Sequence, residues 1–183
     1  GAWAAHFPPG AVVDATVQEV KDYGVVLDLQ ADDDVVGLAS PHQAGAGKLK
    51  PGQEVRARVL DVQRAEGVVD VSLDTRLLPP AAPAAAPRLA PGSQIDAVVE
   101  LDRSEAGYVV LSVGGGAAVG FAAHAHPNLA GAPASAAPPA PEPGSACKAR
   151  VLEAPCEATG GRLMLCLLGS GGEREGGGGG GGG

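Results

Sequence analysis

Aromatic residues are scarce in this sequence: its 183 residues include one Trp, two Tyr and two Phe. A surface that binds nucleic acid by stacking bases on rings therefore has few positions to use. No apolar run approaches the ~18 residues that a transmembrane helix needs, and no signal peptide is visible, so we expect no membrane partner. The cysteines at 147, 156 and 166 are odd in number and lack a CxxC spacing, which favours reduced thiols over a disulfide framework.

Basic residues are also in the minority, with 13 Lys and Arg against 21 Asp and Glu and a net charge of −8. Non-specific wrapping by nucleic acid rests on many Lys and Arg contacts to phosphates, so this balance argues against it. Motifs of nucleophilic or metal-dependent catalysis are missing, and the Gly114–Gly116 run is not followed by Lys and Ser or Thr. We therefore expect no enzyme, no cofactor, no metal and no small-molecule substrate. Because the chain begins with Gly1 rather than Met, we also expect it to be a piece of a longer protein.

Against these absences stands one phrase that occurs four times: Pro-Gly, two residues, an apolar residue, one residue, Ala, one residue and Val. Its copies open at Pro9, Pro51, Pro91 and Pro143. The Pro-Gly pair favours a turn, and the alternation after it is typical of a strand with one buried face. The first and third copies lie 82 residues apart, which indicates a duplicated small β-domain that uses the phrase twice.

The repeat divides the chain into two units, a barrel over 7–78 and a second barrel over 91–168. The strands expected in the first unit are Ala11–Val20, Val25–Leu29, Val35–Ala39, Gln53–Gln63 and Val68–Leu73. Those expected in the second unit are Gln94–Leu101, Tyr108–Val113, Ala118–Ala122, Ser145–Leu152 and Arg162–Leu168. Five short strands separated by turn residues are typical of an OB-type barrel, so the predicted fold class is all-β, with two tandem five-stranded barrels.

Three further segments are unsuited to packing a core. Residues 79–90 are an Ala/Pro linker, 130–143 an Ala/Pro insertion between the third and fourth strands of the second unit, and 169–183 a Gly-rich tail. Such compositions bury too little apolar surface to pack a core. The linker favours extended backbone, and we expect the insertion and the tail to be disordered.

Parts of the first unit resemble the S1 RNA-binding domain, a five-stranded OB-type barrel. The resemblance is carried by Lys21–Leu27, Val35–Ser40 and Gln53–Val62. It implies that the chain binds single-stranded RNA.

A narrower resemblance is to the ribosomal RNA processing protein 5 family, the large multi-S1 nucleolar factors of eukaryotes. In the first unit it is carried by Asp33–Gly37 and Val59–Leu73. The second unit is similar to the next repeat of plant and algal members through Tyr108–Val113, Val119–Ala122 and Gly161–Leu165. What this implies is a non-catalytic RNA-binding scaffold in pre-rRNA processing and ribosomal subunit assembly, in the nucleus and nucleolus, with pre-ribosomal RNA and assembly factors as partners.

The S1 resemblance also implies which residues contact RNA, because S1 domains use aromatics on the second and third strands, a His near the third, and basic residues on the fourth and fifth. Tyr23 matches the first aromatic position, whereas Val26 takes the second and Asp70 stands where a cation would help. With one Tyr per barrel we expect weak binding. The candidate RNA-binding residues are Tyr23, His42, Lys48, Lys50, Arg56, Arg58 and Arg64 in the first unit and Tyr108, His124, Lys148 and Arg150 in the second.

Other interpretations remain open. Tyr23 is equally explained as a cap on the barrel's end, and Arg56 and Arg58 as a solvated strand face that prevents edge aggregation. Phe121 aligns with Leu38, which favours core packing. The two barrels could have lost RNA binding and serve as protein-docking or spacer modules, or they could be an S1 appendage of a ribonuclease.

Overall fold

The computed structural model describes residues 2–31, 34–45, 47–78, 89–124, 141–156, 159 and 162–168. Most of the predicted linker 79–90, most of the predicted insertion 130–143 and the whole predicted tail 169–183 lie outside the described residues. No helix among the described residues is long and apolar enough to cross a membrane.

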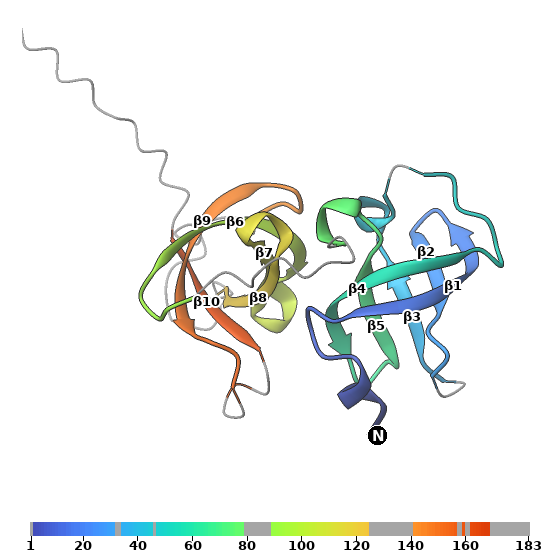
Figure 1. Cartoon of the computed structure of the whole chain (residues 1–183), viewed down its shortest axis with the longest axis horizontal. Helices are drawn as coiled ribbons and strands as arrows, with labels where there is room; N and C mark the ends of the chain where they lie inside the picture. Colours follow the sequence, from blue (N-terminus) through green and yellow to red (C-terminus); the bar gives the residue numbers. More distant parts are fainter. Residues whose placement is uncertain are drawn as a thin grey trace, which may run out of the picture.

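Within the described ranges the secondary structure consists of ten strands and five short 3₁₀ helices (Figure 1). The elements of the first unit are η1 (Ala2–His6), β1 (Val12–Lys21), β2 (Gly24–Asp28), β3 (Val36–Ala39), η2 (Pro41–Gln43), β4 (Glu54–Gln63), β5 (Val68–Ser72) and η3 (Thr75–Leu77). Those of the second are β6 (Gln94–Arg103), η4 (Ser104–Ala106), β7 (Tyr108–Val113), η5 (Gly114–Gly116), β8 (Ala118–Ala123), β9 (Ala146–Glu153) and β10 (Leu163–Leu168). All ten predicted strands are present, with ends within two residues of the expected ones.

Each unit is a closed five-stranded barrel, which confirms the predicted fold class. The strand order is β1-β2-β3-β5-β4 in the first barrel and β10-β8-β7-β6-β9 in the second. Both close through one parallel pair, β3 with β5 and β8 with β10, while the other pairs are antiparallel. The two barrels lie side by side along the long axis of the molecule (Figure 1).

The repeated Pro-Gly phrase has the same structural role in all four copies. Each glycine has a φ between 86° and 91°, in the left-handed region that favours glycine. Each also donates its backbone N–H across the barrel at 2.7 Å, pairing Gly10 with Val59, Gly52 with Val17, Gly92 with Val151 and Gly144 with Val99. The phrase therefore ties together both ends of β1 and β4, and both ends of β6 and β9.

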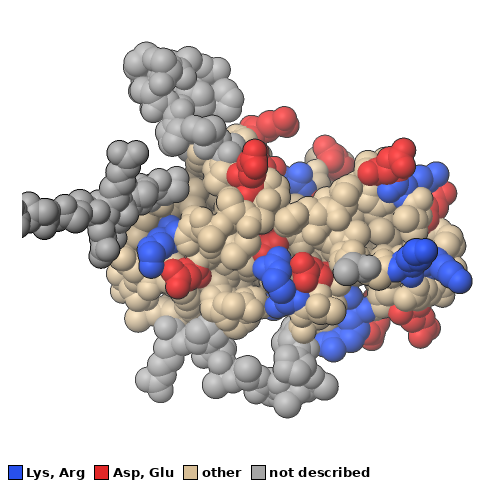
Figure 2. Space-filling model, turned by 90° about the horizontal axis from the view of Figure 1, so that it is seen from above, with Lys and Arg blue, Asp and Glu red and all other residues tan. Residues whose placement is uncertain are grey.

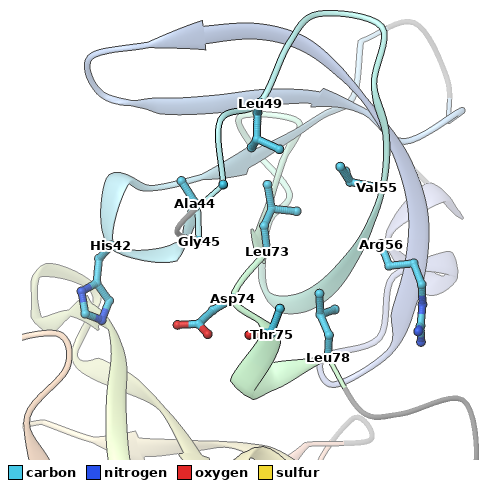
Figure 3. Close-up of a pocket in the computed structure, with 11 residues that line it drawn as sticks. His42, Ala44, Gly45, Leu49, Val55, Arg56, Leu73, Asp74, Thr75 and Leu78 are labelled. Carbon is cyan, nitrogen blue, oxygen red and sulfur yellow. The ribbon is translucent and has the colours of Figure 1, made fainter.

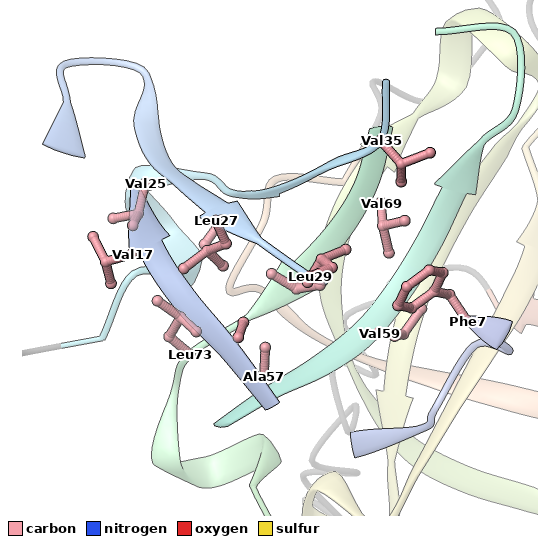
Figure 4. Packing of buried hydrophobic residues seen from close by; sticks show 13 residues of the cluster. Phe7, Val17, Val25, Leu27, Leu29, Val35, Ala57, Val59, Val69 and Leu73 are labelled. Atoms are coloured by element: carbon pink, nitrogen blue, oxygen red, sulfur yellow. The ribbon is translucent and has the colours of Figure 1, made fainter. Parts of the chain in front are cut away.

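The barrel interiors are filled by the inward positions of the strands. In the first barrel, Leu27 and Val59 are fully buried among valines, and Phe7 from the segment after η1 packs over one end (Figure 4). Leu111 and Val151 fill the same places in the second barrel. Burying such a side chain is worth about 1.5–3 kcal/mol, so the alternation in the sequence is sufficient to close each barrel.

Gly24 lies at the start of β2, where the backbone of β2 approaches the end of β3 closely. Its φ is 139°, and a Cβ there would lie 2.2 Å from the carbonyl oxygen of Ala39. We expect Gly24→Ala to lower the free energy of unfolding by about 1–3 kcal/mol or more, because it adds a backbone clash to a strained φ.

Urea denaturation checks this prediction. Gly47→Ala is the control, since nothing lies within 4 Å of a Cβ at Gly47 and its φ is not in the left-handed region; its change should stay within about 0.5 kcal/mol. Equal stabilities of the two variants would contradict the close contact between β2 and β3.

Candidate nucleic-acid interface

Residues on the outer face of the first barrel are buried where the second barrel covers them. On β4, Ala57 and Val59 point into the barrel, so Arg58 and Leu60 point outward, yet these two are only 5% and 0% exposed. On β7, Val110 also points outward and is fully buried. The outer face of β4 and β5 therefore packs against the outer face of β6, β7 and β8, and we call this contact the junction (Figure 1).

The centre of the junction is apolar. Its buried members are Leu60 and Leu77 from the first barrel and Val110, Val119 and Phe121 from the second. Phe121 also packs at a tilted angle against the ring of Tyr108, with ring centroids 5.8 Å apart. Phe121 thus packs in a hydrophobic core as predicted, but in the core between the barrels.

Arg58 crosses the junction from one side. Its guanidinium donates to the carbonyl oxygens of Gly10 (2.8 Å) and Leu77 (3.1 Å) in its own barrel. It also donates to those of Gly116 (2.6 Å) and Ala117 (2.9 Å) in the second barrel. Burial lowers the pKa of this guanidinium, and the four carbonyl oxygens provide the hydrogen bonds that it would otherwise make to water.

Glu100 enters the junction from the other side, and its carboxylate is fully buried. It accepts hydrogen bonds from the Ser112 hydroxyl at 2.7 Å and from Gln43 Nε2 at 2.6 Å. Arg76 Nη2 lies 3.1 Å from Glu100 Oε1 and supplies a countercharge. Ser72 in turn donates to Gln43 Oε1 at 2.6 Å, so the network runs from one barrel wall to the other.

A second polar group lies at the edge of the junction. Tyr108 donates its hydroxyl to Asp61 Oδ2 at 2.5 Å, and Arg103 forms ion pairs with Asp70 and, at 3.5 Å, with Asp61. Burial raises the pKa of the Asp70 carboxyl, although Arg103 and a hydrogen bond from Gln63 act in the opposite direction. Burial and the hydrogen bond to Asp61 raise the pKa of Tyr108 well above its usual range.

An open groove of about 600 Å³ lies at one end of the first barrel (Figure 3). Leu49, Val55 and Leu73 form its apolar floor, with His42 at one rim and Arg56 at the other. Asp74 also lines the groove, but its carboxylate accepts from the backbone of Arg76 and pairs with the Arg76 guanidinium at 3.3 Å. The groove therefore presents an apolar floor between two basic side chains.

More of the predicted residues lie close to this groove. Lys48 and Lys50 flank Leu49 and are exposed. Tyr23 is 60% exposed, in the turn between β1 and β2, and its neighbour Gly24 packs against the Ala39–Ser40 backbone that leads into η2. The structure thus brings Tyr23, His42, Lys48, Lys50 and Arg56 to one end of the first barrel.

The remaining predicted residues lie elsewhere. Arg64 is exposed in the turn after β4, far along the strand from Arg56. His124 is half-buried at the end of β8, where its N–H donates to Gly107. Arg150 is exposed on β9, and so is Lys148, which pairs with Asp96 at 3.1 Å.

Arg58 and Tyr108 lie in the junction, so we do not propose them as RNA contacts. The strand pairing shows that Tyr108 is not the counterpart of Tyr23. Tyr108 pairs with Arg103 in the second barrel, and Gly24 pairs with Lys21 at the same place in the first. Tyr108 therefore occupies the position of Gly24. Across the described residues, the second barrel has no ring at the Tyr23 position, where Gly107 stands.

Sequence reasoning missed the buried polar residues of the junction, above all Glu100, Gln43 and Asp61. A polar residue at an outward strand position is indistinguishable in sequence from a solvated one. The apolar run Val109–Leu111 breaks the alternation, as strands buried on both faces do, but the equally unbroken run Val25–Leu27 has a partly exposed outer residue, so such a run does not distinguish the two faces.

Two closed five-stranded barrels in tandem, each opened and braced by the same Pro-Gly phrase, define a protein of two OB-type barrels. Over 76 residues the chain is 41% identical to the rRNA biogenesis protein RRP5 of Arabidopsis thaliana, and it resembles a fragment of that protein. The match covers 42% of this chain and 4% of the Arabidopsis protein, so the matched segment is a small part of that relative. No family model matches the chain.

Solved structures that the chain matches in part include GSP13 from Bacillus subtilis, 26% identical, covering 45% of this chain and 67% of that one with a TM-score of 0.36. A complex of a/eIF2alpha, aDim2p and rRNA from Pyrococcus horikoshii contains a chain 28% identical, covering 37% of this chain and 45% of that one with a TM-score of 0.34. A multidomain protein with nucleic acid binding domains from Streptococcus pneumoniae is 21% identical and covers 86% of this chain and 50% of that one, with a TM-score of 0.33.

The junction predicts unequal costs for two arginines on one strand. Arg58→Ala should lower the free energy of unfolding by about 3 kcal/mol, because it leaves buried carbonyl oxygens without donors and opens a hole between the barrels. Arg56→Ala, two residues away and exposed, should change it by at most about 0.5 kcal/mol. Chemical denaturation measures both, and a mild effect of Arg58→Ala would show that its hydrogen bonds are replaced by water.

Tyr108 predicts a late step in a pH titration. Its hydrogen bond to Asp61 is made below the ordinary tyrosine pKa of about 10 and is lost as the pH rises through the higher folded-state pKa. Absorbance at 295 nm should therefore show a tyrosine that ionises well above pH 10, and Tyr108→Phe should remove that step. If the late step instead persists in Tyr108→Phe, the assignment to Tyr108 is wrong.

Proposed function

We propose that this chain is an RNA-binding module of ribosome biogenesis, in which the first barrel contacts single-stranded RNA at its groove. The observation that carries the proposal is the groove itself. An apolar floor suits a base, and the exposed guanidinium of Arg56 on its rim and the lysines of the adjoining loop suit the phosphates on either side of that base.

Tyr23 supplies the stacking surface in this proposal. It is the exposed ring at the groove end of the barrel, 60% accessible to solvent. A base stacked on such a ring contributes about 1–3 kcal/mol, whereas each phosphate contact adds a salt-dependent term. With one ring and a few cations, the affinity of the isolated chain is modest.

The charge distribution supports selective contact at the groove over general wrapping. Figure 2 shows Lys and Arg side chains interspersed with Asp and Glu over one face of the described residues, without an extended area of either sign. The net charge of −8 also repels RNA at long range. RNA binding therefore has to come from a local site.

The RNA in this proposal is pre-ribosomal RNA, and the role is that of a non-catalytic scaffold in the nucleolus beside other assembly factors. This rests on the resemblance to a protein whose name describes rRNA biogenesis. The proposed RNA contacts are base stacking on Tyr23 and contacts of Lys and Arg with phosphates, and the proposal gives no described residue a catalytic role. Within the described residues there is also no cluster of three His, Cys, Asp or Glu that could hold a metal ion.

A second candidate function applies to the second barrel, which we propose as a docking module. Its strands β7 and β8 correspond to β2 and β3 of the first barrel, and their outer face is buried in the junction. The same face therefore serves protein contact in this barrel. Arg64, His124, Lys148 and Arg150 remain predictions as additional RNA contacts outside the groove.

Fluorescence anisotropy with a short single-stranded RNA at low salt tests the RNA proposal. We expect Tyr23→Ala to weaken binding by about 5- to 150-fold, which corresponds to the loss of one stacked base. A Lys48→Gln, Lys50→Gln double variant should lower the slope of log K against log salt by about 2, one for each phosphate contact.

Arg64→Gln is the matched control, because it removes an exposed cation of the same barrel at the other end of β4. If RNA contacts the first barrel at the groove alone, affinity and salt slope stay near those of the parent chain, and a drop in both would make Arg64 an additional contact. Equal effects of the groove variants and Arg64→Gln would mean that attraction is diffuse, and unchanged affinity in all variants would overturn the groove as the binding site.

A further inference from the structure

The strand pairing shows which residue of the second barrel is structurally equivalent to each outward-facing strand residue of the first barrel. Val12 pairs with Arg58 as Gln94 pairs with Arg150, so Arg150 on β9 is the counterpart of Arg58 on β4. By the same count Leu152 is the counterpart of Leu60, and Glu153 that of Asp61. The second barrel therefore carries its own version of the β4 surface that forms the junction.

The junction joins two different faces, so each barrel keeps one of the two faces free. The second barrel keeps the outer face of β9, here called the tail face, which carries Arg150, Leu152 and Glu153, whereas Met164 on β10 already packs against the junction. The first barrel keeps the outer face of β1 to β3, the head face, which carries Val26, Val36 and Leu38. Figure 1 shows β9 and β10 on the far side of the second barrel and β1 and β2 on the far side of the first.

We propose that the tail face of one copy of this chain binds the head face of a second copy, in the geometry that the two barrels already use within one chain. A contact between unlike faces does not close on itself, so the same geometry repeats from copy to copy. The occupant of the tail face is thus a second copy of this chain.

The apolar centre of the junction has a partial counterpart in the proposed contact, because no described residue follows β10 as Leu77 follows β5. In the junction Leu60 is fully buried and packs in one cluster with Val110, Val119 and Phe121. The corresponding residue of the tail face, Leu152, is 50% exposed. The positions of Val110, Val119 and Phe121 are taken on the head face by Val26, Val36 and Leu38, all apolar and partly exposed.

The charges also match between the tail and head faces. Arg58 meets the backbone that leads from η5 into β8, and in the first barrel the segment before β3 carries the exposed Asp34, which would face Arg150. In the junction Asp61 forms an ion pair with Arg103. The counterpart of Asp61 on the tail face is Glu153, and the counterpart of Arg103 on the head face is Lys21, so the proposed contact pairs Glu153 with Lys21. Each basic side chain of the proposed contact therefore has an acidic partner.

The proposed contact is weaker than the junction for a visible reason. On the head face Gly24 stands where the second barrel has Tyr108, and Gln18 stands where the second barrel has the buried Glu100. The contact therefore lacks the hydroxyl that Asp61 accepts and the carboxylate on which Gln43, Ser112 and Arg76 converge. We expect reversible association that depends on concentration.

Sedimentation of the full chain over a wide concentration range tests the proposal. Leu152→Asp places a charge in the centre of the tail face, and Val26→Asp does so on the head face. We expect each to weaken self-association by about tenfold or more. Lys148→Gln is the control, because it changes the charge of β9 by the same amount at a position whose counterpart, Arg56, stays outside the junction.

Mixing the two blocked variants gives the decisive result. Each keeps one intact face, so an equimolar mixture should form a 1:1 dimer and nothing larger. A mixture that stays monomeric, a parent chain that stays monomeric throughout, or association that survives in either variant would each overturn the proposal. Should Val26→Asp lower stability, Asp34→Arg tests the head face by charge reversal at an exposed position.

Discussion

The buried polar network between the barrels is the constraint on which the rest of this structure depends. Arg58 and Glu100 are charged side chains held away from water, and each is tolerated only because several partners converge on it. Those partners come from both barrels, so a small rotation of one barrel would leave buried groups without hydrogen bonds. Apolar contact between Leu60 and Phe121 favours association, but the polar groups determine which orientation is allowed.

This constraint separates the functions of two similar barrels. Both have the same strand order and the same Pro-Gly bracing, yet the outer face of β7 and β8 is used for protein contact and that of β2 and β3 is free. The free groove and Tyr23 then belong to the first barrel alone. The repeat thus gives one barrel whose groove end is open and one whose outer β7–β8 face is packed in the junction.

The sequence predicted the barrels well because their determinants are local. Alternating apolar residues after Pro51 and Pro143 specify a strand and its buried face without any knowledge of distant contacts. The RNA-binding role of Tyr23, Lys48 and Arg56 stays a prediction, but their shared position at one end of the first barrel follows from the strand order, which brings the β1–β2 turn, the segment before β4 and the start of β4 together. Arg58 and Tyr108 were misplaced because their environment is made by the other barrel, and no local pattern records which outer face becomes covered. The unbroken run at Val109–Leu111 does not record it either, because Val25–Leu27 is equally unbroken and its outer residue Val26 stays partly exposed.

Residual dipolar couplings of backbone amides in both barrels test the central claim most directly. If the junction holds the barrels in one orientation, a single alignment tensor fits the couplings of residues on β1 to β5 together with those on β6 to β10. Two tensors of different magnitude or direction would mean that the barrels move independently, and would contradict a junction held by Arg58 and Glu100.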